Sequence, residues 1–185
     1  MGLDGSPGLL TDENESMLKP EKYDPLNRSI GHVLDIIGKG WAILIIREAY
    51  FGTRRFEDFQ QRLGVARNVL TNRLKKLCEN QVLERVPIKK GAKRHEYLLT
   101  SKGKALTPLL IALTQWGDKW VLGDNSEAII FMDREFGEPV ADIRVYSSRG
   151  RQLSARDIIV SAGPGASPEA RNRIDELNLL FESGD

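Results

Sequence analysis

Five polar side chains that can hydrogen-bond to nucleic-acid bases or phosphates share one face of a predicted helix. The segment ARNVLTNRLKKLCENQ, residues 66–81, predicts this helix because leucines recur along one apolar stripe, at Leu70, Leu74 and Leu77. At 100° per residue the other face carries Arg67, Asn68, Thr71, Asn72 and Lys75. Arg67 matches the paired acceptors of a guanine, and Asn68 or Asn72 matches the paired groups of an adenine. The alternative is a solvated helix face with no ligand.

A cationic hairpin is predicted directly after this helix. Two β-favouring runs, 83–88 and 95–99, flank a turn that carries Lys89, Lys90, Lys93 and Arg94. Such a tip would lie along a DNA backbone or in a minor groove and would add affinity with little base information. Arg54 and Arg55, at the start of an earlier helical segment, are assigned to the same backbone-contacting set. The alternative is a charged turn without a partner.

The charge of the chain divides into two opposite regions. Residues 54–104 hold 14 Lys and Arg against five acidic residues, a net charge of +9, whereas the remaining residues hold 13 against 21, or −8. The net charge of +1 for the whole chain conceals this division. A basic block inside an otherwise acidic protein favours a polyanionic partner. A basic face exposed only to solvent is the competing interpretation.

The helices that position this surface are predicted by apolar spacing. Residues 30–37 and 41–45 predict two helices separated by Gly-Lys-Gly at 38–40, and RRFEDFQQRL, 54–63, predicts a third that ends at Gly64. A longer helix is expected over 101–122, where leucines and tryptophans form a wide stripe that Pro108 should break or kink. Helix, tight turn, second helix and hairpin is the order of a winged helix-turn-helix domain.

The chain is expected to be α+β, with a mainly helical winged helix-turn-helix domain, a small β extension and a terminal helix. Residues 1–27 are interpreted as a polar N-terminal arm, 28–123 as the DNA-binding and dimerisation domain, and 124–185 as the extension with its closing helix. Strand-like runs at 128–133, 138–147 and 155–163 predict the extension. Ser167 and Pro168 indicate the start of the closing helix.

The run from Ser29 to Trp120 resembles the HxlR-type winged-helix transcription regulators, relatives of the MarR group. The resemblance rests on LDIIGKGWAILIIREAYFGTRRFEDFQQRLGVARNVLTNRLKKL, RHEYLLTSKGKAL and ALTQWGDKW, and it covers half of the chain. It implies a transcriptional regulator that is a homodimer with paired terminal helices, bound to a pseudo-palindromic operator in double-stranded DNA. The dimer contacts expected on the terminal helix are Leu109, Leu113, Trp116 and Trp120. Burial within one chain would explain the same apolar stripe.

Two positions depart from that family pattern. Many members carry a sensor cysteine just before the first helix, where this chain has Arg28. Longer members carry a Cys-x-x-Cys-Gly turn in a small zinc ribbon, whereas the turn here is YSSRG, with Tyr146 and Arg149 at the thiolate positions. We therefore expect no metal site and no cofactor. Apolar residues should hold a degenerate, zinc-ribbon-like extension instead, namely Ile129, Phe131, Val140, Ile143, Val145, Ile158 and Val160.

Enzymatic and membrane functions are not indicated. His32 and His95 have no nucleophile motif near them, and the glycine-rich pieces at 38–40 and 163–165 lack the context of nucleotide loops. No apolar run approaches the roughly 18 residues of a membrane span, and the first residues lack the basic region of a secretory signal. The cytoplasm is the expected location. Cys78, the single cysteine, excludes an intramolecular disulfide and is expected to be a buried small hydrophobe rather than a redox sensor.

Control by a small apolar or aromatic effector is expected, since the sequence offers neither the sensor cysteine nor a metal site. A pocket between the dimer helices and the extension would use Trp41, Tyr50, Trp116, Trp120 and Phe131, although plain core packing is the alternative for these residues. The competing function is a winged-helix ligand-binding or protein-interaction module that does not bind an operator. The +9 segment favours the DNA-binding regulator, because such a module needs no basic recognition face and wing.

Overall fold

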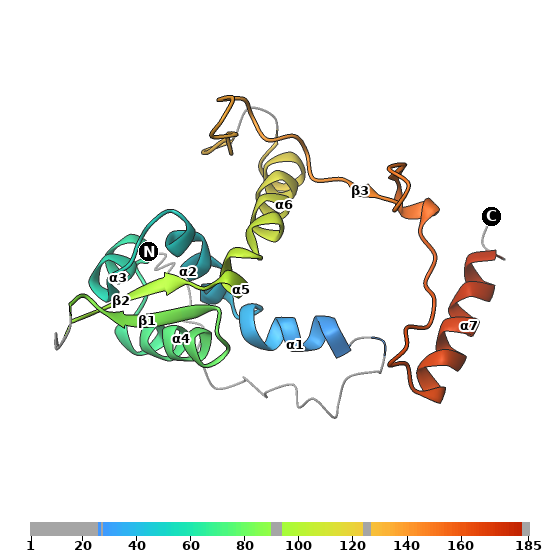
Figure 1. Cartoon of the computed structure of the whole chain (residues 1–185), viewed down its shortest axis with the longest axis horizontal. Helices are drawn as coiled ribbons and strands as arrows, with labels where there is room; N and C mark the ends of the chain where they lie inside the picture. Colours follow the sequence, from blue (N-terminus) through green and yellow to red (C-terminus); the bar gives the residue numbers. More distant parts are fainter. Residues whose placement is uncertain (1–25, 27, 90–93, 124–126, 183–185) are drawn as a thin grey trace, which may run out of the picture.

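The first two helices of the winged domain are separated by a sharp bend at glycine. The structure is a computed structural model that describes residues 26, 28–89, 94–123 and 127–182 (Figure 1). α1 spans Arg28–Ile37 and α2 spans Gly40–Tyr50, and the two are bent by 72°, which confirms the Gly-Lys-Gly break. Gly38 lies at the bend, where a β-carbon would overlap the carbonyl oxygen of Leu34. No single helix within these ranges is long and apolar enough to cross a membrane, and α1 and α2 meet that test only when they are combined across the bend.

α3 (Phe56–Leu63) and α4 (Arg67–Glu79) form the helix-turn-helix pair that the spacing predicts. Gly64 ends α3 with a left-handed φ of 64°, which glycine adopts without the steric cost of a β-carbon. The leucine stripe of α4 is buried against Phe59 and the two isoleucines Ile45 and Ile46 of α2. Burying a side chain of this size contributes about 1.5–3 kcal/mol. This cluster therefore fixes α4 with its polar face outward.

The wing is an antiparallel hairpin of β1 (Leu83–Pro87) and β2 (His95–Leu99), as predicted. Leu83 pairs with Leu99 at the base, and Pro87 pairs with His95 near the tip. The backbone N–H of Tyr97 donates to the carbonyl of Arg54 at 2.8 Å, which ties β2 to the segment before α3. Two of the predicted wing residues, Lys90 and Lys93, lie outside the described residues, as does the N-terminal arm over 1–25.

The helix expected over 101–122 is interrupted just before Pro108. α5 spans Ser101–Lys104 and α6 spans Thr107–Gly117, with Pro108 in the first turn of α6, where its missing N–H leaves no helical bond unmade. A wider π-helical turn, η4, continues over Asp118–Leu122. Gly103 packs so closely on the base of the wing that a β-carbon would overlap the carbonyl of Val82. This contact seats α5, from which α6 projects away from the winged domain (Figure 1).

The C-terminal extension contains much less strand than the sequence predicts. The paired strands described after residue 127 are β3 (Val145–Tyr146) and β4 (Gln152–Leu153), with one isolated bridge between Met132 and Pro139. Residues Ala155–Asp157 form a short 3-10 helix, η5. The prediction of strands over 128–133, 138–147 and 155–163 is therefore wrong for most of those residues. β-Favouring runs become strands only where a partner strand hydrogen-bonds to them.

The residues predicted to hold the extension together do not form a core. The side chains of Ile129, Ile143, Val145, Ile158 and Val160 are exposed, and those of Phe131 and Val140 are half-buried. In Figure 1 the extension leaves the end of α6 as an open chain that arches away from the winged domain toward α7. No zinc-ribbon-like domain is seen in the described residues. Over the residues that the structure describes, the fold is mainly helical with two small sheets.

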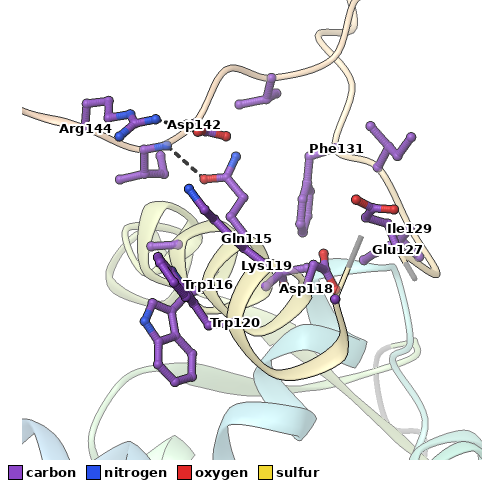
Figure 2. Close-up of a pocket in the computed structure, with 16 residues that line it drawn as sticks. Gln115, Trp116, Asp118, Lys119, Trp120, Glu127, Ile129, Phe131, Asp142 and Arg144 are labelled. Carbon is purple, nitrogen blue, oxygen red and sulfur yellow. Dashed lines mark hydrogen bonds and ion pairs between the residues drawn. The ribbon is translucent and has the colours of Figure 1, made fainter. Parts of the chain in front are cut away.

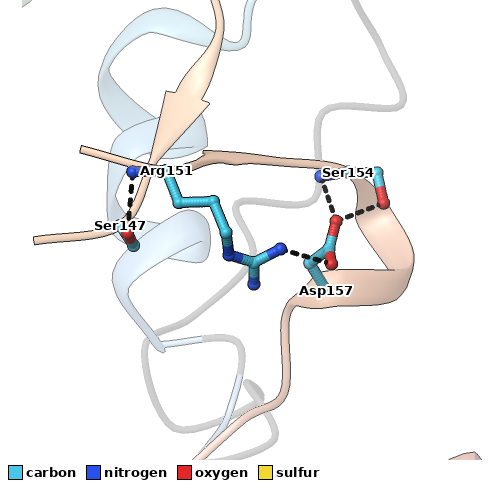
Figure 3. Close-up of polar contacts among 4 residues, drawn as sticks. All are labelled: Ser147, Arg151, Ser154 and Asp157. Atoms are coloured by element: carbon cyan, nitrogen blue, oxygen red, sulfur yellow. Dashed lines mark hydrogen bonds and ion pairs between the residues drawn. The ribbon is translucent and has the colours of Figure 1, made fainter. Parts of the chain in front are cut away.

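A polar network joins Arg151 and Ser154, on either side of β4, to Asp157 of η5 (Figure 3). Arg151 Nη1 donates to Asp157 Oδ1 at 2.8 Å, and the Ser154 hydroxyl and N–H donate to Asp157 Oδ2 at 2.6 and 2.8 Å. The Ser154 hydroxyl first, and Arg151 next, hold the pKa of the Asp157 carboxyl well below its usual range. α7 spans Pro168–Glu182, as predicted, and the Ser167 hydroxyl accepts from the Ala170 N–H at 3.2 Å.

Candidate nucleic-acid interface

All five predicted side chains on the polar face of α4 are exposed. The amides of Asn68 and Asn72 have no hydrogen-bond partner in the described part of the chain, so their donors and acceptors are available together. Thr71 Oγ1 donates back to the Arg67 carbonyl at 2.8 Å, which leaves its methyl group and oxygen lone pairs outward. Lys75 Nζ lies 3.8 Å from Glu79 Oε1 in an exposed pair that solvent screens. The polar face of α4 can therefore both donate hydrogen bonds to base edges and accept them from base edges.

A basic cleft of about 560 Å³ lies between α3, the start of α4 and the wing. Four guanidinium side chains line this arginine cleft, those of Arg55, Arg67, Arg85 and Arg94. Two carboxylates, Glu57 and Asp58, also line it, so positive charge is in surplus. Planar guanidinium groups match the geometry of phosphate oxygens. The cleft is therefore suited to one phosphate of a nucleic-acid backbone.

Contacts with neighbouring side chains hold three of the four guanidinium groups of the arginine cleft in place. The Arg67 guanidinium carbon lies 4.9 Å from the centroid of the Phe56 ring, a cation–π contact. Arg55 Nε lies 3.8 Å from Glu96 Oε1, and Arg85 Nη2 lies 3.1 Å from His95 Nδ1. Within the described residues no side chain caps the first turn of α4, so its backbone N–H groups add partial positive charge beside Arg67.

At two arginines the structure of the cleft differs from what the sequence predicts. The stack on Phe56 turns Arg67 toward the cleft, whereas the sequence placed it on the base-contacting face with the asparagines. Arg85 is exposed on β1 and belongs to the +9 segment. The sequence does not mark it as a DNA contact, because strand periodicity does not indicate which helix the wing faces. Of the remaining predicted backbone contacts, Arg54 and Lys89 are exposed and Arg94 lines the cleft.

The predicted dimer contacts form an exposed apolar stripe on α6 and η4. Leu109, Leu113, Trp116 and Trp120 are 39%, 49%, 58% and 67% exposed. The alternative that these residues are buried within one chain does not hold for this structure. A contiguous apolar stripe that the protomer leaves uncovered is typical of an interaction surface.

The five aromatic residues predicted to share an effector pocket do not line one cavity. Trp41 packs against the buried core of the winged domain. Tyr50 and Phe131, with ring centroids 6.3 Å apart, line a small cavity of about 160 Å³ between α2 and α6. Trp116, Trp120 and Phe131 line a larger cavity of about 730 Å³ between α6 and the extension (Figure 2). Phe131 borders both cavities.

Gln115 attaches the extension to α6 at the larger cavity (Figure 2). Its Nε2 donates to the carbonyl of Ala141 at 3.2 Å, and its Oε1 accepts from the N–H of Ile143 at 2.8 Å. The side-chain amide thus pairs with the extended chain as a neighbouring strand would. Arg144 pairs with Asp142 at 2.7 Å, and Lys119 lies 5.1 Å from the centroid of the Trp120 ring. The larger cavity therefore contains charges of both signs.

Cys78 is half-buried on the last turn of α4 beside the wing. Burial raises the pKa of its thiol, and the guanidinium of Arg85 opposes part of that rise. The cation that lowers the pKa of the thiol thus belongs to the wing, while Glu79 on the same helix raises the pKa further. A thiol whose pKa is raised holds less of the reactive thiolate at neutral pH.

Together, the helix pair α3–α4, the wing and the exposed polar face of α4 define a winged helix-turn-helix protein of the DNA-binding type. The sequence profile of the HxlR-like helix-turn-helix family matches residues 36–125. The chain is 35% identical over 137 residues to the uncharacterized HTH-type transcriptional regulator Rv3095 of Mycobacterium tuberculosis, an alignment that covers 74% of this chain and 87% of that protein. The chain belongs to the HxlR-like helix-turn-helix family, which comprises transcriptional regulators and not enzymes.

Two solved structures share the fold. One is the crystal structure of PA1607, a candidate transcription factor whose sequence is 40% identical to this chain. The two superpose with a TM-score of 0.67 over 72% of this chain and 94% of PA1607. The structure of PA1374 from Pseudomonas aeruginosa, also a candidate transcription factor, is 35% identical, with a TM-score of 0.57, and covers 81% of this chain and 99% of that one. Both matches cover more of this chain than the family profile does, so the likeness is not confined to residues 36–125.

Proposed function

We propose that this transcriptional regulator binds a pseudo-palindromic operator as a homodimer, and that a small apolar or aromatic effector controls the binding. The observation that carries the proposal is the pairing of an exposed, hydrogen-bonding face on α4 with an arginine cleft directly beside it. The first supplies groups that distinguish bases, and the second supplies charge that attracts phosphate. A winged-helix module without an operator would need neither.

α4 is the helix proposed to enter the major groove, which is about 12 Å wide and admits one helix. Asn68 and Asn72 are the proposed base contacts, since an exposed amide can bond to both paired groups of an adenine. Thr71 offers a methyl group to a thymine, and Lys75 lies at the far end of the same face, where a phosphate or a guanine is within reach.

The arginine cleft is the proposed phosphate site of each half-operator. Arg67 joins it as a backbone contact rather than a base contact, because its guanidinium is held on Phe56 at the uncapped start of α4. Arg85 and Arg94 face the same phosphate from the wing. Lys89 and Arg54, both exposed, extend this backbone contact beyond the cleft.

Dimerisation through the stripe on α6 follows from its exposure. A two-fold axis that pairs Leu109, Leu113, Trp116 and Trp120 with their symmetry mates would remove this apolar surface from water. It would also present two α4 helices to half-sites about 34 Å apart, one turn of DNA. Every contact made by one protomer is then made twice.

Effector control is supported by the position of the two cavities, both of which have α6 as a wall. A ligand shifts an equilibrium only if it binds one arrangement better than the other. A molecule held between α6 and either α2 or the extension favours one placement of the dimer helix relative to α4. It would thereby change the spacing of the two recognition helices.

Fluorescence anisotropy with DNA from the regulator's own promoter region tests the proposal, together with sedimentation equilibrium for the oligomeric state. We expect a dimer whose log affinity falls with log salt by about 0.9 for each phosphate contact. Binding that does not depend on salt, or a folded protein that remains monomeric at micromolar concentration, would contradict it.

A further inference from the structure

We infer that the small cavity between α2, α6 and Phe131 binds a small aromatic or alicyclic carboxylate, with the carboxylate paired to Arg47 and the ring against the side chains of Tyr50 and Phe131. The inference rests on the proposed effector control and specifies its ligand. It concerns one of the two cavities and assigns a role to a residue that the sequence did not indicate.

The walls of this cavity are suited to one ring. They comprise Ile43, Leu44, Tyr50 and Phe51 of α2 and its end, Leu110, Leu113 and Thr114 of α6, and Phe131. Its volume is about 160 Å³. An apolar protein cavity of about 150 Å³ is known to hold benzene, so a single six-membered ring fills this space. Tyr50 and Phe131 meet at an interplanar angle of 59°, and an inserted ring would contact both.

Arg47 supplies the polar end. Of the described residues that line the cavity, Arg47 is the one that carries a charge. One of its five N–H donors goes to Glu48 Oε1 at 3.0 Å, while its Nε has no acceptor although it is shielded from solvent. Glu48 is buried behind it and is not a lining residue, and its second oxygen accepts from the Thr53 hydroxyl at 3.3 Å. Arg47 therefore keeps an unused N–H donor for a ligand carboxylate although it is ion-paired with Glu48.

The larger cavity does not have this selectivity. Its lining includes the cations Lys119 and Arg144 and three carboxylates, those of Asp118, Glu127 and Asp142. Arg144 is paired with Asp142 as Arg47 is paired with Glu48, but of the described carboxylates three line the larger cavity and none lines the small one. A ligand anion would meet more negative than positive charge there. The small cavity is thus the one of the two whose charge and size together favour a compact organic anion.

A carboxylate in this cavity would touch three parts of the protein at once. Arg47 belongs to α2, which packs against α4, while Leu110 and Leu113 belong to the proposed dimer helix. Phe131 belongs to the extension. Filling the space between them would fix the angle of α6 on the winged domain, and that angle determines how far apart two α4 helices lie in the dimer.

Isothermal titration calorimetry of the full chain with benzoate, and with benzamide as its neutral match, tests the site. A hydrogen bond to a charged partner is worth about 1.5–3 kcal/mol, so we expect benzoate to bind about tenfold or more tightly than benzamide. Arg47→Gln should remove that preference and Arg47→Lys should keep part of it. Arg171→Gln, an exposed arginine on α7, is the matched control and should leave both affinities unchanged. Phe131→Ala should weaken both ligands.

Equal binding of the two ligands by the wild-type protein, or a preference for benzoate that survives in folded Arg47→Gln, would overturn the site. If Arg47→Gln unfolds because Glu48 is left without its partner, the double variant Arg47→Gln/Glu48→Gln removes both charges and carries the same test. Operator affinity is measured alongside. If benzoate binds with the expected preference but operator affinity does not change, effector control at this site is refuted. If the site fails its test while the operator is still bound, the proposed DNA binding stands.

Discussion

Replacing Arg85 with glutamine removes one guanidinium group from the arginine cleft and retains a side chain that can still hydrogen-bond. Arg85 is exposed, and its Nη2 contact at 3.1 Å is with His95, so the core of the winged domain is not disturbed. The cleft keeps Arg55, Arg67 and Arg94. The substitution therefore tests whether the wing side of the cleft binds a phosphate.

The magnitude follows from symmetry. In the proposed homodimer the substitution removes one guanidinium group from each of two phosphate sites. Each neutralised phosphate contributes about 0.9 to the slope of log affinity against log salt, so the slope should fall by up to about 1.8. Across a fourfold change in salt, the loss of affinity should then be up to about tenfold smaller than for wild type. Asn72→Ala should instead cost about 1–3 kcal/mol on the operator and leave the slope unchanged.

Anisotropy titrations at several salt concentrations, on the operator and on random DNA of the same length, provide the assay. Arg85→Gln should weaken both DNAs alike, whereas Asn72→Ala should weaken the operator alone. Arg171→Gln is the control for a change in net charge far from the cleft. An unchanged slope for Arg85→Gln, or equal losses on both DNAs for Asn72→Ala, would refute the division between phosphate cleft and base-contacting face.

Three further predictions concern stability and the thiol. Gly103→Ala should destabilise the protein by about 1–3 kcal/mol, because its β-carbon would overlap the Val82 carbonyl. Gly117→Ala should stabilise it by about 0.5–1 kcal/mol, because Gly117 has a helical φ of −63° and open space around it. Urea unfolding measures both changes, and equal effects would contradict the packing of Gly103 on the wing. Because the pKa of Cys78 is raised, its thiol should react more slowly with iodoacetamide at pH 7 than free cysteine, and diamide should leave operator binding intact. Release of the operator by diamide that disappears in Cys78→Ser would point to a thiol switch instead. Stoichiometric zinc in the purified protein would point to a metal switch. Because the pKa of Asp157 is lowered on folding, its contribution to the contact between η5 and the ends of β4 is present above the unfolded value of about 3.9 and is lost as pH falls toward the folded value. At neutral pH, Asp157→Asn should speed exchange of the Ser154 amide proton, measured by NMR, and unchanged exchange would show that the Asp157 carboxylate does not protect this amide.

The winged domain could be predicted from the sequence because its periodicity and its burial have the same origin. Leu70, Leu74 and Leu77 recur at helical spacing, and in the structure they are buried against α2 and α3. The exposure of the polar face of α4 follows from the burial of the leucines. Likewise, Gly64 marks the end of α3 in the sequence because the left-handed backbone there favours glycine.

The arginine cleft could not be predicted in the same way. Periodicity indicates on which face of its own helix or strand a residue lies, but the cleft is made by two elements that meet through the core. Arg67 and Arg85 are 18 positions apart in the chain, and both line the cleft because the base of the wing packs on the end of α4. The stack of Arg67 on Phe56 likewise depends on the turn between α3 and α4.

The extension shows where a strand pattern misleads, and it leads to one more prediction. Runs such as Ile158, Ile159 and Val160 predict strands because such residues are usually buried, yet in this protomer they are 44%, 76% and 43% exposed. In the proposed homodimer a second copy is the available cover for them. Amide exchange over residues 158–160, followed by mass spectrometry, should therefore be slower in wild type than in Leu109→Lys, which places a charge on the proposed dimer stripe and lines neither cavity. Residues 56–63 of α3, which pack within the winged domain, serve as the internal control. Equal exchange over 158–160 in a dimeric wild type and a monomeric variant would show that the apolar pattern of the extension does not reflect burial between copies.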